Sequence, residues 1–117
     1  MSHFNILRSK LTDVEILKSS LRSLGLVVQT NTTVRGYGCQ TVRADVVAVL
    51  KGDYDLGWSR NADGSFNLIA DLWGVAKNHN MAALLNSINQ SYAVNQTLAA
   101  VKRPGLQNAT VQLVLTS

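Results

Sequence analysis

The sequence predicts an α+β domain in which two helices cover one face of a mostly antiparallel sheet. Apolar residues recur at helical spacing in only two stretches, near residues 12–24 and 81–102. Elsewhere, apolar and polar residues alternate with a period of two between clusters of turn residues. The resulting order β-α-β-β-β-β-α-β is related to the ferredoxin-like plan and forms a single domain over residues 1–117.

Composition places the chain among intracellular globular proteins. It has 117 residues, of which 46% are hydrophobic and only 15% charged, and its net charge of +4 indicates a mildly basic, solvated surface. The longest apolar run, residues 46–50, is far shorter than a membrane span, and the N-terminus has no signal-peptide pattern. The single cysteine, Cys39, excludes an intrachain disulfide and fits a reducing compartment. We expect a cytoplasmic protein without membrane association.

Local patterning predicts the first strand and the first helix. Residues 3–8 alternate and form the strand. Thr12 and Glu15 have the spacing of a capping box, so a helix begins there and runs to about residue 24, where Gly25 stops it. Its buried stripe consists of Val14, Leu17, Leu21 and Leu24.

The middle of the chain predicts two strands separated by a loop. Residues 26–30 form a strand, and the polar, glycine-containing stretch 31–39 forms the loop. Residues 44–51 are apolar on both faces and form a central strand. Gly52 and Asp53 make a two-residue type II′ turn to the next strand. This turn pairs Lys51 with Tyr54, Val49 with Leu56, Val47 with Trp58 and Asp45 with Arg60.

A bulged hairpin follows at Asn61–Gly64. Its residues favour a type I turn with Gly64 at positive φ and Asn61 opposite Ser65. The register then places Trp58 opposite Leu68, Leu56 opposite Ala70 and Tyr54 opposite Leu72. A loop of two or four residues would pair Trp58 with Asn67, so the hydrophobic pattern selects the bulged turn.

Combining the two turns assigns side chains to the two faces of the sheet. The helices cover the face of Val47, Val49, Leu56, Trp58, Leu68 and Ala70. The second face carries Val46, Ala48, Leu50, Asp55, Gly57, Ile69, Asp71 and Trp73. Asp55 lies directly across from Asp71, which is unfavourable unless a cation, a proton, an arginine or water relieves the repulsion.

The C-terminal part predicts a long helix and a last strand. Asn80 is the N-cap of a helix over 81–102, which Pro104 and Gly105 end. Its apolar stripe consists of Leu84, Leu85, Ile88 and Tyr92, continued by Val94, Leu98 and Val101. Residues 110–115 alternate and form the strand.

The search for reactive groups finds no catalytic constellation. His3, His79 and Cys39 lack the spacing of a metal site, so we expect no metal and no cofactor. Asp55 with Asp71 could hold a divalent cation or act as an acid/base pair, but an arginine or water satisfies such pairs more often. We therefore predict that the protein is not an enzyme.

Several segments resemble a known family over nearly the whole chain. They are Met1–Phe4, Val34–Thr41, Ala44–Val47, Tyr54–Gly57 and Leu68–Val75. They are similar to a domain-of-unknown-function family of cyanobacteria and red-lineage plastids, known as hypothetical chloroplast reading frame thirty-five. The resemblance implies a cytosolic or stromal protein of photosynthetic lineages and supplies no activity, cofactor or catalytic residue. Cyanobacterial viruses also carry relatives, and a viral source would place the protein in the host cytoplasm.

Two hypotheses for function follow. The first is a protein-binding or assembly module, because the second sheet face has nothing in this chain to cover it. Its patch would consist of Val46, Leu50, Ile69 and Trp73, and Gly57 would let the partner, most simply a second copy, approach closely. Asp55 and Asp71 would then lie at the rim or meet an arginine of the partner. The alternative is binding of an anion or single-stranded nucleic acid through Arg35, Tyr37 and Arg43. In the first hypothesis the long loop could instead fold over this face and leave a monomer.

Overall fold

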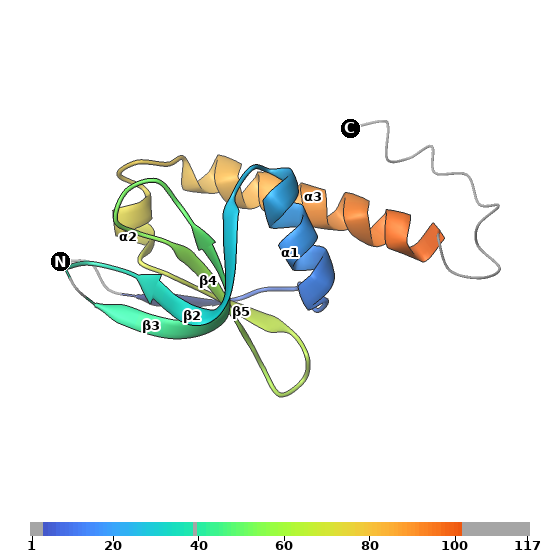
Figure 1. The fold of residues 1–117 in the computed structure, drawn as a ribbon, viewed down its shortest axis with the longest axis horizontal. Coiled ribbons are helices and arrows are strands. Elements are labelled where there is room, and N and C mark those ends of the chain that lie inside the picture. The colour runs from blue at the N-terminus through green and yellow to red at the C-terminus, as the bar shows by residue number, and fades with distance from the viewer. Residues whose placement is uncertain (1–3, 39, 102–117) are drawn as a thin grey trace.

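The computed structural model describes residues 4–38 and 40–101 and shows the expected α+β architecture, with helices packed on one face of an antiparallel sheet (Figure 1). The elements are β1 (Asn5–Arg8), α1 (Val14–Ser23), β2 (Val27–Arg35), β3 (Thr41–Val49), β4 (Leu56–Arg60), β5 (Phe66–Ala70), α2 (Leu72–Val75) and α3 (Met81–Val101). The strand order β1-β5-β4-β3-β2 makes β1 and β2 the edge strands. The predicted strand over 110–115, the helix stop at Pro104 and Gly105, and Cys39 lie outside the described residues.

The bulged hairpin between β4 and β5 is confirmed. The Asn61 amide donates to the Ser65 carbonyl at 2.7 Å, and the Gly64 amide donates to the Asn61 carbonyl at 3.0 Å. Gly64 has a φ of 91°, the left-handed conformation that the bulge requires. Trp58 therefore lies opposite Leu68, as the hydrophobic pattern predicted.

The predicted register between β3 and β4 is wrong by one residue. Trp58 lies opposite Val46 instead of Val47. The connection is wider than a two-residue turn because the Asp55 carboxylate accepts a hydrogen bond from the Leu50 amide at 3.3 Å across it. A shift of one residue exchanges the two faces of a strand. Val46, Ala48 and Leu50 consequently pack in the helix-side core.

The predicted loop over 31–39 is in part a strand, because β2 continues to Arg35. Val28 packs against the helix-side core, whereas Val34 packs on the opposite face of the sheet. Residues an even number apart share one face of an unbroken strand, so β2 must turn over between them. The turning point is Asn31, whose φ is 50°. The paired strands β2 and β3 curve together beyond it (Figure 1).

This curvature lets the far part of the β2–β3 hairpin cover the second sheet face. Val34, Ala44 and Val47 are buried there in a separate small core, with Phe4 and Val49 packed against it. A Cβ at Gly57 would collide with the Val34 side chain and approach the Ala44 Cβ to 3.0 Å. Gly57 thus admits a strand pair of its own chain, and the prediction that it admits a partner chain does not match this packing.

The helices begin and end close to their predicted bounds. The cap of α1 is Asp13 and not Thr12, since the Asp13 carboxylate accepts hydrogen bonds from the backbone amides of Glu15 and Ile16. The Tyr92 hydroxyl of α3 accepts the amides of Thr12 and Asp13 at 3.2 and 2.9 Å and thereby fixes the entry to α1. As predicted, Asn80 caps α3. Two members of the predicted α3 stripe are exposed, namely Val94 and Leu98.

The short helix α2 is not predicted by the sequence. The Asp71 carboxylate accepts a hydrogen bond from the Gly74 amide at 3.0 Å and starts this helix directly after β5. The ladder between β4 and β5 ends at Leu56 and Ala70, so the predicted pair of Tyr54 with Leu72 does not form.

Candidate functional site

The predicted apolar patch on the second sheet face does not form. Val46 and Leu50 lie in the helix-side core, and Ile69 is buried. Trp73 alone of the four is exposed, with 61% of its surface accessible, and it lies on α2 with the Lys77 Nζ 4.2 Å from its ring centroid. The one-residue shift of β3 and the curvature of β2 together explain this correction.

Asp55 receives its arginine from within the chain. Arg35 binds its carboxylate through two side-chain hydrogen bonds, Nη2 to Oδ1 at 2.8 Å and Nε to Oδ2 at 2.9 Å. The Arg35 amide donates to the same carboxylate at 3.1 Å. This hydrogen bonding to Asp55 raises the pKa of Arg35 above its ordinary value. The prediction that a partner chain supplies this arginine does not match the structure, because Arg35 of the same chain pairs with the buried Asp55 side chain.

Asp71 is also buried, and its role is local. Its Oδ1 caps α2, while its Oδ2 has no hydrogen-bond partner among the described residues. Among residues 4–38 and 40–101 no group of three histidine, cysteine, aspartate or glutamate side chains could hold a metal ion. Asp55 binds Arg35, whereas Asp71 caps α2. Neither residue lines a described cavity.

The three residues predicted to bind an anion lie in different surroundings. Arg35 is held by Asp55, whereas the Arg43 Nη2 donates to the Asn31 carbonyl at 2.8 Å. Tyr37 is exposed and shares a shallow depression with Arg35 but not with Arg43. The three side chains therefore do not converge on one site.

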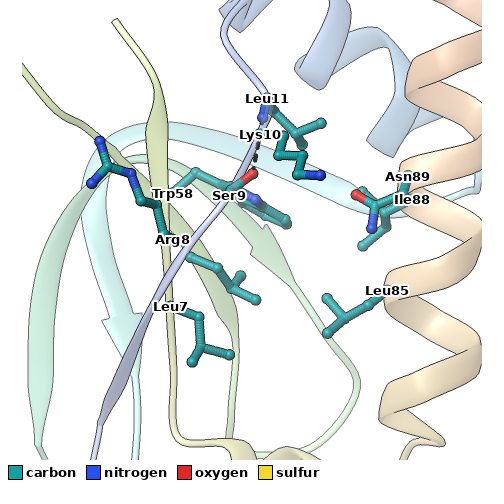
Figure 2. Close-up of a pocket in the computed structure, with 10 residues that line it drawn as sticks. Leu7, Arg8, Ser9, Lys10, Leu11, Trp58, Leu85, Ile88 and Asn89 are labelled. Atoms are coloured by element: carbon teal, nitrogen blue, oxygen red, sulfur yellow. Dashed lines mark hydrogen bonds between the residues drawn. The ribbon is translucent and has the colours of Figure 1, made fainter. Parts of the chain in front are cut away.

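The largest described cavity lies between β1 and α3, on the helix side of the sheet edge, and we call it the β1–α3 groove (Figure 2). Its volume is about 540 Å³, within the range of pockets that bind ligands. Figure 2 shows the strand segment on one side and the helix side chains facing it from the other. The groove is lined by Leu7, Arg8, Ser9, Lys10, Leu11, Trp58, Leu68, Leu85, Ile88 and Asn89.

The lining of the β1–α3 groove is apolar at its base and basic at its rim. Trp58 is buried at the base, and Leu85 and Ile88 form the helical wall. The lining contains two cationic residues and no carboxylate. Arg8 is already paired with Asp63 at 2.8 Å on the surface. Hydrogen bonds from the hydroxyl and the amide of Ser65 hold the pKa of Asp63 below its ordinary value.

Within residues 4–38 and 40–101, no strand pairs with the outer edge of β1, the strand beside the groove. Ile6 and Leu7 are 65% and 44% exposed, high values for apolar strand residues. The Ser9 amide donates to the Phe66 carbonyl at 2.9 Å, so it faces the neighbouring strand β5. Because hydrogen bonding alternates along an antiparallel strand, the backbone groups of Ile6 and Arg8 face outward.

Sequence reasoning did not find the groove. A signal was present, since the adjacent Ile6 and Leu7 give the strand an apolar residue on each side and two cations, Arg8 and Lys10, follow closely. Locating the groove requires the path of α3 across the sheet, which periodicity alone does not give.

Comparison with known proteins identifies relatives without an assigned activity. A family model described as "Protein of unknown function (DUF1257)" matches residues 20–113. An "Uncharacterized protein ycf35" from Guillardia theta is 33% identical over 116 residues, covering 96% of this chain and 89% of that protein. A protein of the same description from Pyropia yezoensis is 28% identical over 109 residues, covering 92% of this chain and 84% of that protein. No solved structure matches significantly.

Proposed function

The chain belongs to the DUF1257 family of proteins of unknown function, and we propose that it is a non-enzymatic protein-binding module whose β1 edge accepts an extended segment of a partner protein. The resemblance to a chloroplast reading frame supports a setting in the cytoplasm or plastid stroma of a photosynthetic lineage. No helix among the described residues is long and apolar enough to cross a membrane.

One observation carries this proposal: an open strand edge with exposed apolar side chains lies beside an apolar groove. An added strand would form main-chain hydrogen bonds with the outward groups of Ile6 and Arg8. Its side chains on the helix side would enter the β1–α3 groove. Peptide-binding domains that extend a sheet next to a helix use this arrangement.

The opposite edge of the sheet is a poorer acceptor. Strand β2 bends at Asn31, which has a φ of 50° and is skipped in the ladder with β3. A partner segment on this edge would have to follow the bend to pair along the whole strand. The geometry therefore favours β1 over β2.

Binding through the sheet face or by Arg35, Tyr37 and Arg43 has less support. The second face is covered by the β2–β3 hairpin, and Arg35 is engaged by Asp55. A second copy is also a less favourable occupant of the edge, because its own Arg8 and Lys10 would add to the positive charge that this edge already carries.

A pair of substitutions at Ile6 tests strand addition. Ile6→Pro removes the outward amide but leaves the hydrogen bonds to β5, whereas Ile6→Thr keeps the amide and removes apolar surface. Phage-displayed random peptides selected on the full-length protein serve as probes. We expect Ile6→Pro to abolish peptide binding and Ile6→Thr to weaken it only partly.

Hydrogen exchange gives an independent readout of the same proposal. Bound peptide should slow exchange of the Ile6 and Arg8 amides, while the Leu7 amide, already paired with β5, changes less. A folded Ile6→Pro protein that binds the selected peptides with unchanged affinity would show that the edge is not the site.

A further inference from the structure

We infer that the β1–α3 groove is the specificity pocket of this binding surface, which takes one apolar side chain of the partner segment next to an acidic residue that pairs with Lys10. This inference rests on the proposed addition of a strand to β1. It names the chemistry of the partner: an extended segment with an aliphatic or aromatic anchor flanked by Asp or Glu.

The position of the groove relative to β1 determines which partner side chains can enter it. Leu7 lies opposite Leu68, whose side chain belongs to the helix-side core, so the groove opens on this side of the sheet. Successive side chains of an added strand alternate between the two faces. Every second side chain of the partner would therefore point toward Leu85 and Ile88 of α3.

The groove favours an apolar group at its base. Trp58 and Leu68 come from the sheet, and Leu11 follows β1 along the same wall. Figure 2 shows Trp58 on the sheet side of the cavity and Leu85 and Ile88 of α3 on the other side. A polar side chain inserted here would lose hydration against mostly apolar walls, whereas an apolar side chain would gain burial.

Charge at the rim favours an acidic neighbour. Lys10 is exposed and, within the part of the chain that the structure describes, forms no ion pair. It extends from the strand toward α3 above the cavity (Figure 2). Arg8 is partly neutralised by Asp63, so Lys10 is the cation available to a ligand. No carboxylate in the groove lining competes for it.

Tryptophan fluorescence can report occupation of the groove directly. The chain has two tryptophans, and Trp73→Phe leaves Trp58 as the only one. The probes are short peptides of alternating Thr and Val with one central Leu followed by Glu, and matched peptides with Leu→Ala or Glu→Lys. We expect the Leu and Glu peptide to change Trp58 emission, and the Leu→Ala peptide to bind about tenfold or more weakly.

A charge exchange tests the role of Lys10. Lys10→Glu should weaken binding of the Glu peptide and strengthen binding of the Lys peptide, each by several-fold, with the difference shrinking at high salt. Lys51→Glu is the matched control, because Lys51 is exposed on the loop between β3 and β4. It makes the same change in net charge and should leave the preference for the Glu peptide unchanged.

The outcomes separate the inference from the proposed function. Equal binding of the Leu and Ala peptides, together with loss of binding in Ile6→Pro, overturns the pocket and leaves strand addition standing. Absence of binding by every peptide overturns both.

Decanoate is a further probe, because the groove could instead hold an amphipathic carboxylate. Decanoate could quench Trp58 emission to the same extent in the wild type and in Ile6→Pro, without displacing bound peptide. That result would contradict a pocket for a peptide side chain.

Discussion

At the scale of single residues, Arg35 connects the β2–β3 hairpin to the loop between β3 and β4. Its guanidinium binds the Asp55 carboxylate and also donates to the Leu50 carbonyl at 3.1 Å. Removal of one member of a buried ion pair leaves the other charge uncompensated, which is more costly than loss of a surface pair. We expect Arg35→Ala to lower the free energy of unfolding by about 2–3 kcal/mol, less than for a fully buried pair because the Arg35 side chain is partly exposed.

Arg43→Ala is the control for this prediction, since Arg43 is exposed and donates its side-chain hydrogen bond to a backbone carbonyl on the neighbouring strand, not to a carboxylate. Its expected effect is within about 0.5 kcal/mol. Urea unfolding measures both variants, and equal effects would contradict the structural role of Arg35.

Gly64 allows a prediction about backbone conformation alone. No atom lies within 4 Å of a Cβ built at Gly64, so a side chain there meets no steric obstacle. Gly64→Val should nevertheless reduce stability by about 1–2 kcal/mol, because a β-branched residue resists a positive φ. Gly64→Asn, which tolerates this conformation, should lose less in the same urea experiment. Equal losses in the two variants would point to a cause other than φ.

Residue-level reasoning from the sequence was accurate where local turn chemistry decided the structure. The turn at Asn61–Gly64 gave the correct register for β4 and β5, whose ladder ends at Leu56 and Ala70, one residue short of Asp55 and Asp71. The identity of the compensating arginine could not be derived. Arg35 is 20 residues away from Asp55, and its position depends on the reversal of β2 at Asn31.

At the scale of elements, one hydroxyl joins the two long helices. Tyr92 of α3 accepts the backbone amides of Thr12 and Asp13 at the start of α1. We expect Tyr92→Phe to reduce stability by about 1–2 kcal/mol, because both partly buried amides lose their acceptor. Tyr37→Phe, at an exposed position, is the control and should change stability by less than about 0.5 kcal/mol. Thermal unfolding followed by circular dichroism measures both, and an unchanged Tyr92→Phe protein would contradict the predicted role of the hydroxyl.

The packing of the β2–β3 hairpin on β4 predicts coupling between Gly57 and Val34. Gly57→Ala alone forces a methyl group against the Val34 side chain and should cost about 1–3 kcal/mol. Val34→Ala removes buried surface but makes room for that methyl group. The double variant should therefore be more stable than the sum of the single effects predicts, by at least about 0.5 kcal/mol. Additive effects in a denaturant double-mutant cycle would indicate that the hairpin does not pack on Gly57.

The errors at this scale have a common physical origin. Gly52 and Asp53 have the composition of a tight turn, yet the Asp55 side chain supplies hydrogen bonds that hold a wider connection. Side-chain hydrogen bonds of this kind compete with backbone turns. Because the actual register differs by one residue, Val46 and Leu50 lie on the helix side of the sheet and not on the second face. The predicted binding patch loses these two residues.

At the scale of the whole molecule, the α+β class followed from periodicity because most elements are long enough to show it. The helix stripes and alternating strands required no tertiary information. The β1–α3 groove was beyond such reasoning, because it depends on where α3 crosses the sheet and on which strand remains at the edge. Ile88 and Tyr92 were correctly expected to be buried, while the exposure of Val94 and Leu98 shows that the end of α3 lacks a sheet beneath it.

The unequal edges of the sheet limit how many partners the protein can join in a row. A sheet with two competent edges can connect one neighbour to the next without limit, which leads to fibres. Here β2 bends at Asn31, so that β1 is the described edge without a bend. Each chain would then bind one partner segment and would not link two partners through opposite edges of its sheet. Isothermal titration with a selected peptide should accordingly give a stoichiometry close to one, and a second equivalent site would require β2 to accept a strand across its bend.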